Sequence, residues 1–121
     1  MGFPTIHENV KLVIGLIFSD GDKLTRTESK ISKAFGSIDY QSEIINFTYT
    51  DYYREEFGPS LMRKFISIER LWPIENIHKV KLTTNKIEGI LAEGKKRTVN
   101  IDPGYLTLGK LILLTDRKSV V

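Results

Sequence analysis

At 121 residues, with 40% hydrophobic and 27% charged side chains, the chain has the size and composition of one globular domain and not of a disordered segment. Its net charge of +3 is only mildly basic, so charge by itself gives little support for a nucleic-acid partner. Because the sequence contains no cysteine, disulfides, thiol catalysis and cysteine-based zinc sites are excluded.

The longest apolar run, from Leu12 to Phe18, is far too short to span a membrane. No small-residue cleavage site of the kind that ends a signal peptide follows it. We therefore expect a cytoplasmic protein with no membrane partner, and the lack of cysteine fits the reducing interior of a cell.

The first two predicted elements are a strand and a helix. Residues 10–18 are apolar at nearly every position, which predicts a central strand covered on both faces. A helix is predicted over 24–35, with Thr25 and Glu28 at capping-box spacing near its start. Gly36 follows directly and is the expected terminator.

The middle of the chain predicts two more strands, over 38–48 and 61–71, separated by a short helical turn over 50–58. Apolar residues then keep helical spacing over 74–93, which predicts one long helix. The run around Thr84 is a poor helix interior because its short polar side chains compete for backbone hydrogen bonds. We expect a kink or a break in the helix there.

A charged loop over 94–97 and a closing apolar strand after it complete the predicted elements. The order of the main elements is therefore strand, helix, strand, strand, helix, strand. With a right-handed crossover at each helix, a ferredoxin-like sandwich satisfies that order. We therefore expect an α+β fold of the ferredoxin-like βαββαβ type, with a four-stranded antiparallel sheet and two helices on one face.

We expect residues 1–115 to form a single domain. Residues 116–121 match the translation of a common sequencing adapter and do not continue the apolar pattern before them. They are expected to be a non-native tail, and the chain is expected to be C-terminally truncated near Thr115.

The strongest candidate site lies near the end of the chain, at a turn predicted for Pro103-Gly104. Proline fixes one φ angle and glycine tolerates positive φ, so this dipeptide is typical of a turn. Asn100, Asp102 and Tyr105 would then point into one small region that can bind an anionic or polyhydroxyl ligand. The alternative is that Asp102 only hydrogen-bonds its own backbone.

A second polar group lies at Asp51, Tyr52 and Tyr53, where a carboxylate beside two phenols suits recognition of a sugar or a base. The alternative is a helix cap followed by two half-buried tyrosines. Asn85 and Glu88 reach the same site if their helix is kinked, and otherwise they form a capping pair.

Arg63 and Lys64 are adjacent on a predicted strand and must face opposite sides of it, so at most one of them joins a phosphate site. An exposed salt-bridging role is expected for both. His7 and His78 are far apart in the sequence and stand alone, so no metal site is predicted, and the cofactor is left open.

Several short motifs together resemble one family. They are Asp51-Tyr52-Tyr53, Phe57-Gly58, Arg63-Lys64-Phe65, Thr84-Asn85, Glu88 and the run from Asn100 to Tyr105. With these motifs, residues 11–115 resemble the bacterial and archaeal family known as domain of unknown function 4416. The resemblance implies a small cytoplasmic protein without an established activity, which usually continues into a further C-terminal hairpin. Some members carry a GTP-binding label, but this sequence has no G-x-x-x-x-G-K-[ST] loop.

Three functions stay open at this point. We expect first the binding of a small polar or anionic ligand in a pocket between the Asp51–Tyr53 loop and the Asn100–Tyr105 turn. The alternative is a metal-assisted hydrolase acting on a nucleotide or phosphate ester, with Asp51 or Asp102 as base or metal ligand. The second alternative is RNA binding across an open sheet face, for which Phe65 is the only well-placed ring. Ligand identity and oligomeric state are left open.

Overall fold

The structure is a computed structural model, and it describes residues 8–46, 60–107 and 111–114. Two helices, α1 (Gly21–Phe35) and α3 (Ile77–Leu91), are described, with a short 3₁₀ helix, η1 (Ile74–Asn76), directly before α3. The strands are β1 (Asn9–Phe18), β2 (Ile38–Gln41), β3 (Ile45–Asn46), β4 (Met62–Ile68), β5 (Trp72–Pro73), β6 (Val99–Leu106) and β7 (Leu111–Leu113).

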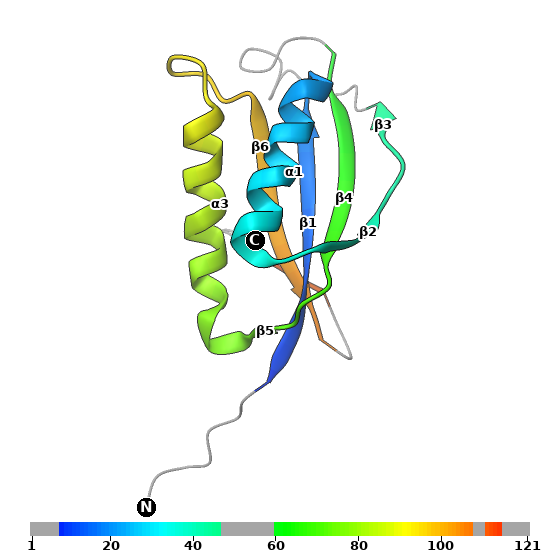
Figure 1. Cartoon of the computed structure of the whole chain (residues 1–121), viewed down its shortest axis with the longest axis vertical. Coiled ribbons are helices and arrows are strands. Elements are labelled where there is room, and N and C mark those ends of the chain that lie inside the picture. Colours follow the sequence, from blue (N-terminus) through cyan, green and yellow to red (C-terminus); the bar gives the residue numbers. More distant parts are fainter. Residues whose placement is uncertain (1–7, 47–59, 108–110, 115–121) are drawn as a thin grey trace, which may run out of the picture.

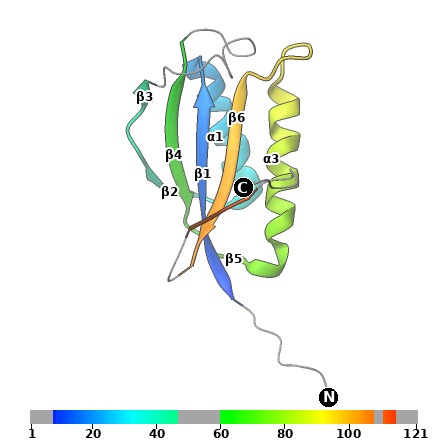
Figure 2. The same ribbon diagram turned by 180° about the vertical axis from the view of Figure 1, so that it is seen from behind.

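The strands form one antiparallel sheet, in which the main order is β2-β4-β1-β6-β7. Two further short strands join it, because β3 pairs with β4 and β5 pairs with β1. Both helices lie on the same face of the sheet (Figure 1). Figure 2 shows the opposite face, which the helices do not cover. The fold is therefore α+β, as predicted.

The prediction of four strands is wrong, because the sheet has seven strands within the described residues. The second predicted strand, over 38–48, is divided into β2 and β3. The short β5 and the terminal β7 add two more. The predicted turn at 50–58 and the predicted tail at 116–121 lie outside the described residues, and the single-domain expectation for 1–115 stays a prediction.

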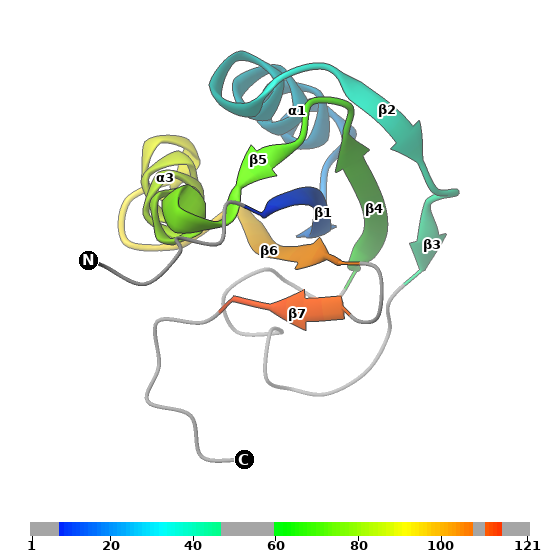
Figure 3. The ribbon, with the colours of Figure 1, turned by 90° about the horizontal axis from the view of Figure 1, so that it is seen from below.

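The core lies between the helices and the face of the sheet that they cover. Every second residue of β1 is buried on this face, and the other β1 side chains point the opposite way. Lys11, Val13 and Gly15 on that opposite face are only partly buried. The expectation that β1 is covered on both faces is therefore wrong for these positions, because the described helices pack on one face only (Figure 3).

Helix α1 begins three residues before the predicted start, because the Asp20 side chain caps it. The carboxylate of Asp20 accepts a hydrogen bond from the Asp22 backbone N–H at 2.7 Å. Thr25 and Glu28 do not form the predicted capping box, since the Thr25 hydroxyl donates instead to the Gly21 carbonyl oxygen. The helix ends where expected, at Gly36, which has a φ of 125°.

Helix α3 runs without a break through Thr84, so the predicted interruption there is wrong. The Thr84 side chain is completely buried, and its hydroxyl donates to the Lys81 carbonyl oxygen at 2.9 Å. The hydroxyl is therefore satisfied within the helix itself, at a carbonyl oxygen whose second lone pair is left for a helical backbone bond. No helix within the described parts of the chain is long and apolar enough to cross a membrane.

The predicted turn at Pro103-Gly104 is also wrong, because both residues lie inside β6. The Pro103 carbonyl oxygen accepts from the Leu114 N–H and therefore points away from β1. The N–H that proline lacks would point the same way, so its absence costs no hydrogen bond between β1 and β6. Gly104 is needed for close approach, since a Cβ there would lie 2.6 Å from the Ile112 carbonyl oxygen. Both residues therefore serve the pairing of β6 with β7.

We expect that shortening a core side chain of β1 destabilises the protein strongly. Ile14 is completely buried between the sheet and the helices, so Ile14→Ala should lower the free energy of unfolding by roughly 2–5 kcal/mol. Ile90→Ala is the matched control, because Ile90 is 56% exposed on α3, and its effect should stay within about 0.5 kcal/mol. Urea unfolding measures both values, and equal losses in the two variants would contradict this core.

Candidate functional site

Asn100 and Asp102 lie on the face of the sheet that the helices leave open. Side chains alternate along β6, and Ile101 between them is completely buried on the helix side. Asn100 is nearly buried, whereas Asp102 is exposed. In the register of the sheet, Asn100 is opposite Ile17 and Asp102 is opposite Gly15 on β1.

These two side chains belong to a chain of hydrogen bonds that begins at Arg97. The Arg97 guanidinium donates to Asn100 Oδ1 at 2.7 Å, and Asn100 Nδ2 donates to Asp102 Oδ2 at 2.9 Å. Because its oxygen and its nitrogen are both engaged, the Asn100 amide has one preferred orientation. One bond involves a guanidinium and the other a carboxylate, so both are of the stronger, charge-assisted kind. We call Arg97, Asn100 and Asp102 the polar chain.

Glu88 of α3 connects the polar chain to the backbone of β6. Its Oε2 atom accepts a hydrogen bond from the Ile101 N–H at 2.6 Å and lies 3.8 Å from the Arg97 guanidinium. Among the described residues, β7 pairs only with positions 104–106 and leaves this part of the β6 edge without a neighbouring strand. The carboxylate thus supplies the acceptor that a strand would otherwise provide.

Burial is the main influence on the acidity of Glu88. It raises the pKa of the Glu88 carboxyl above its usual value of 4.5, because the charged form loses contact with water. The hydrogen bond from Ile101 and the charges of Arg97 and Lys81 act in the opposite direction, and more weakly. The negative charge of Asp102 adds to the upward shift.

Arg63 and Phe65 extend the open face on the other side of β1. Arg63 is opposite Ile17 and Phe65 is opposite Gly15, so each lies in the same row as one member of the polar chain. The Arg63 guanidinium carbon lies 5.4 Å from the centre of the Phe65 ring, a cation–π distance. Lys64 points the other way, as predicted.

The expected exposed role of Lys64 is wrong. Its ammonium group is buried beneath α1, 2.6 Å from a Glu28 carboxylate oxygen and 2.6 Å from the Gln41 side-chain oxygen. This buried pair joins α1 to β4 and β2. Lys64 is therefore part of the packing and not of the open face.

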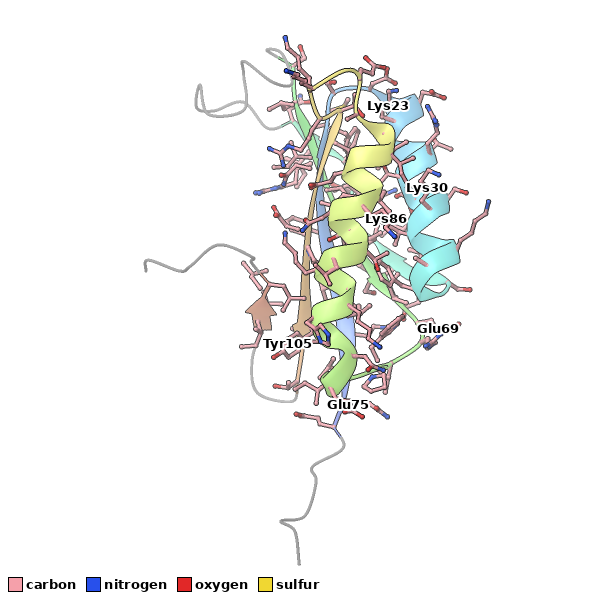
Figure 4. The ribbon with its side chains drawn as sticks, turned by 90° about the vertical axis from the view of Figure 1, so that its left-hand side faces the viewer. Lys23, Lys30, Glu69, Glu75, Lys86 and Tyr105 are labelled. Carbon is pink, nitrogen blue, oxygen red and sulfur yellow. The ribbon has the colours of Figure 1, made fainter. Side chains whose placement is uncertain are left out.

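The structure separates Tyr105 from Asn100 and Asp102. Position 105 falls on the helix side of β6, and the Tyr105 side chain is partly buried against the core. Figure 4 shows Tyr105 at the same end of the molecule as Glu75, where α3 begins. The expectation that all three point into one region depended on the turn at Pro103, and it is wrong for Tyr105.

The remaining predicted site residues have different outcomes. Glu88 contacts the polar chain from a helix that is continuous through Thr84, and Asn85 lies about one turn before it on the same helix. Asp51, Tyr52 and Tyr53 lie outside the described residues, so a pocket between their loop and β6 stays a prediction. Within the described ranges, no three His, Asp or Glu side chains are grouped as a metal ion requires.

Two residues of this region were not predicted as site residues. Arg97 belongs to a basic run that is typical of a solvated loop, yet its spacing of three residues from Asn100 places the two side chains in contact. Gly15 is an isolated glycine inside a strand pattern, which is a known sign of close approach by another group. A Cβ at position 15 would lie 3.1 Å from the Phe65 ring.

Comparison with protein families gives one match. The model of the family described as "Domain of unknown function (DUF4416)" matches residues 8–120. Comparisons with curated proteins and with solved structures give no significant match.

The raised pKa of Glu88 predicts how stability changes with pH. The folded state holds this proton more tightly than the unfolded chain does, so ionisation costs the folded protein stability as pH rises from about 4.5 through the raised pKa. Glu88→Gln keeps an oxygen that can accept from Ile101 but cannot ionise. We therefore expect the wild-type protein to lose stability relative to Glu88→Gln across this window.

Urea unfolding of both proteins at pH values from about 4 to 7 measures that difference. The two free energies of unfolding should be closest at the acidic end, where Glu88 is protonated in both states. A wild-type protein that gains stability relative to Glu88→Gln as the pH rises would contradict the burial of this carboxyl group.

Proposed function

Because the chain belongs to the family described as "Domain of unknown function (DUF4416)", whose description assigns no activity, we propose a function from the side chains themselves. The open face of the sheet binds a small polar or anionic ligand at Asp102 and the polar chain behind it. The protein is, on this proposal, a binding domain.

The observation that carries the proposal is that hydrogen bonds from behind hold the exposed Asp102 carboxylate in place. Asn100 is a nearly buried amide whose two polar atoms are used to connect Arg97 with Asp102. A buried amide adds nothing to an apolar core, and its burial is costly unless its hydrogen bonds are made. What this arrangement does achieve is to hold the Asp102 carboxylate in one position facing solvent, as a binding group requires.

Two further expectations remain parts of this proposal. A contribution from Asp51, Tyr52 and Tyr53 to the same site stays a prediction from the sequence. A cytoplasmic location is proposed from the absence of cysteine, which suits a reducing compartment.

We also propose that the centre of the fold is a ferredoxin-like sandwich. The strand order β2-β4-β1-β6, with every neighbour antiparallel and both helices on one face, supports this description. On this view β3, β5 and β7 are additions to a four-stranded core. Ferredoxin-like folds serve many unrelated functions, so the proposal of ligand binding depends on Asp102 and not on the fold.

The binding proposal is tested by following backbone amide signals of the protein by NMR. The probes are inorganic phosphate, citrate, uridine and methyl α-D-glucopyranoside, each added at millimolar concentrations. At least one probe should shift the signals of Asn100 and Asp102. For a neutral probe that donates hydrogen bonds to the carboxylate, Asp102→Asn should weaken binding by about tenfold, because a hydrogen bond to a charged group contributes roughly 1.5–3 kcal/mol.

Asp39→Asn is the matched control, since Asp39 is a carboxylate on the sheet that bonds to Lys11 and Ser67 instead. Its effect on the binding should be less than twofold. Binding of no probe, or equal weakening by both substitutions, would overturn the proposal.

A further inference from the structure

The centre of the open face carries an aromatic ring that lies against a glycine. Phe65 of β4 is opposite Gly15 of β1, and a Cβ at position 15 would lie 3.1 Å from Cε1 and 3.4 Å from Cδ1 of the ring. One edge of the ring therefore rests where any other residue would place its side chain. Phe65 is nevertheless 38% exposed, so it offers an apolar surface to solvent.

Asp102 lies in the same row of the sheet, on the far side of Gly15. Gly15 is opposite Phe65 on one edge and opposite Asp102 on the other. Two strand spacings separate the backbones of Phe65 and Asp102 by roughly 10 Å. Because the ring leans over Gly15, its edge crosses part of that gap, and a single small molecule can contact both side chains.

The charged member of this row is Asp102, and the Arg63 guanidinium lies in the next row, on the other side of β1 from Asp102. Asp102, the carboxylate next to the ring, would repel a phosphate or a carboxylate placed there. A neutral ligand that donates hydrogen bonds avoids this repulsion and satisfies the acceptor oxygens.

We propose that the row Phe65–Gly15–Asp102 binds a neutral polyhydroxyl ring, such as a pyranose sugar. This inference rests on the proposed function and narrows its ligand to one chemical class. The C–H face of the sugar lies against the exposed part of Phe65, and neighbouring hydroxyl groups donate to Asp102. Arg63, beside the ring, supplies a donor for the sugar oxygens.

The roles of the three positions differ, and substitutions separate them. Phe65→Leu keeps an apolar side chain but removes the ring, so binding of methyl α-D-glucopyranoside should weaken by about fivefold. Gly15→Ala places a methyl group where the ring edge now lies, so it should displace the ring and weaken binding to a similar extent. Leu106→Ala is the matched control, because Leu106 is 40% exposed on the same face but outside the row, and binding should change less than twofold.

The experiment measures the dissociation constants of methyl α-D-glucopyranoside, its manno and galacto isomers, and myo-inositol by NMR titration of the full chain. At least one of these neutral compounds should bind with millimolar affinity, shift the signals of Gly15 and Asp102, and lose affinity in Phe65→Leu. Urea unfolding of each variant confirms that it is folded before its binding is compared.

The outcomes distinguish this inference from the proposed function. If phosphate, citrate or uridine shifts Asp102 while no pyranoside or inositol does, the sugar class is wrong and the binding proposal stands. If a sugar binds equally well to Phe65→Leu and to the wild-type protein, the ring has no role and this inference is overturned. If no compound of either set shifts Asp102, both proposals fail.

Discussion

The structure depends on the pairing of β1 along both of its edges. This central strand is antiparallel to β4 on one edge and to β6 on the other, so its register aligns residues of three strands in rows. Alternation along β1 then assigns every row either to the helices or to the open face. The same pairing that buries Ile14 and Leu16 therefore brings Phe65, Gly15 and Asp102 together on the opposite side.

Glu88 links the two layers at a point where the described part of the sheet has no further strand to offer. Its carboxylate accepts from the Ile101 N–H and lies near Arg97, whose guanidinium begins the polar chain. The position of α3 and the orientation of Asp102 are thus connected through a continuous set of polar contacts. Burying the charged Glu88 carboxylate costs free energy, which one hydrogen bond from the Ile101 N–H offsets only in part. The nearby Arg97 guanidinium gives the Glu88 charge a second partner.

Much of this arrangement could be predicted from the sequence, and the exceptions have physical causes. The apolar run of β1 and the amphipathic helices predicted the α+β class. Residues buried in a strand or a helix recur with the spacing of that element, so the apolar pattern identifies it. Pro103-Gly104 was mistaken for a turn, since the same two residues also suit a sheet edge and a close approach of Ile112. Because of that error, Tyr105 was expected to lie with Asn100 and Asp102, whereas it lies on the helix side of β6. A break was predicted at Thr84 because threonine has a low helix propensity. That propensity does not show that the Thr84 hydroxyl finds its hydrogen-bond partner within the same helix.

The candidate site was predicted only in part, for a related reason. Asn100 and Asp102 were recognised as neighbours because they are two residues apart on one strand. The contributions of Arg63 and Phe65 depend on the register between β4 and β1, which no local pattern specifies. Glu88 was recognised as a polar residue of interest, but its contact with Ile101 spans 13 positions and follows from the packing of α3 on β6.

The shared open face is tested most directly by proton–proton distances in solution. Nuclear Overhauser spectra should show cross-peaks between the ring protons of Phe65 and the α-protons of Gly15, because the ring edge lies against that glycine. Cross-peaks from the Phe65 ring to Ile31 or Val80 in the core, without any to Gly15, would place the ring on the helix side of the sheet. That result would contradict the placement of Phe65 and Asp102 on one open face.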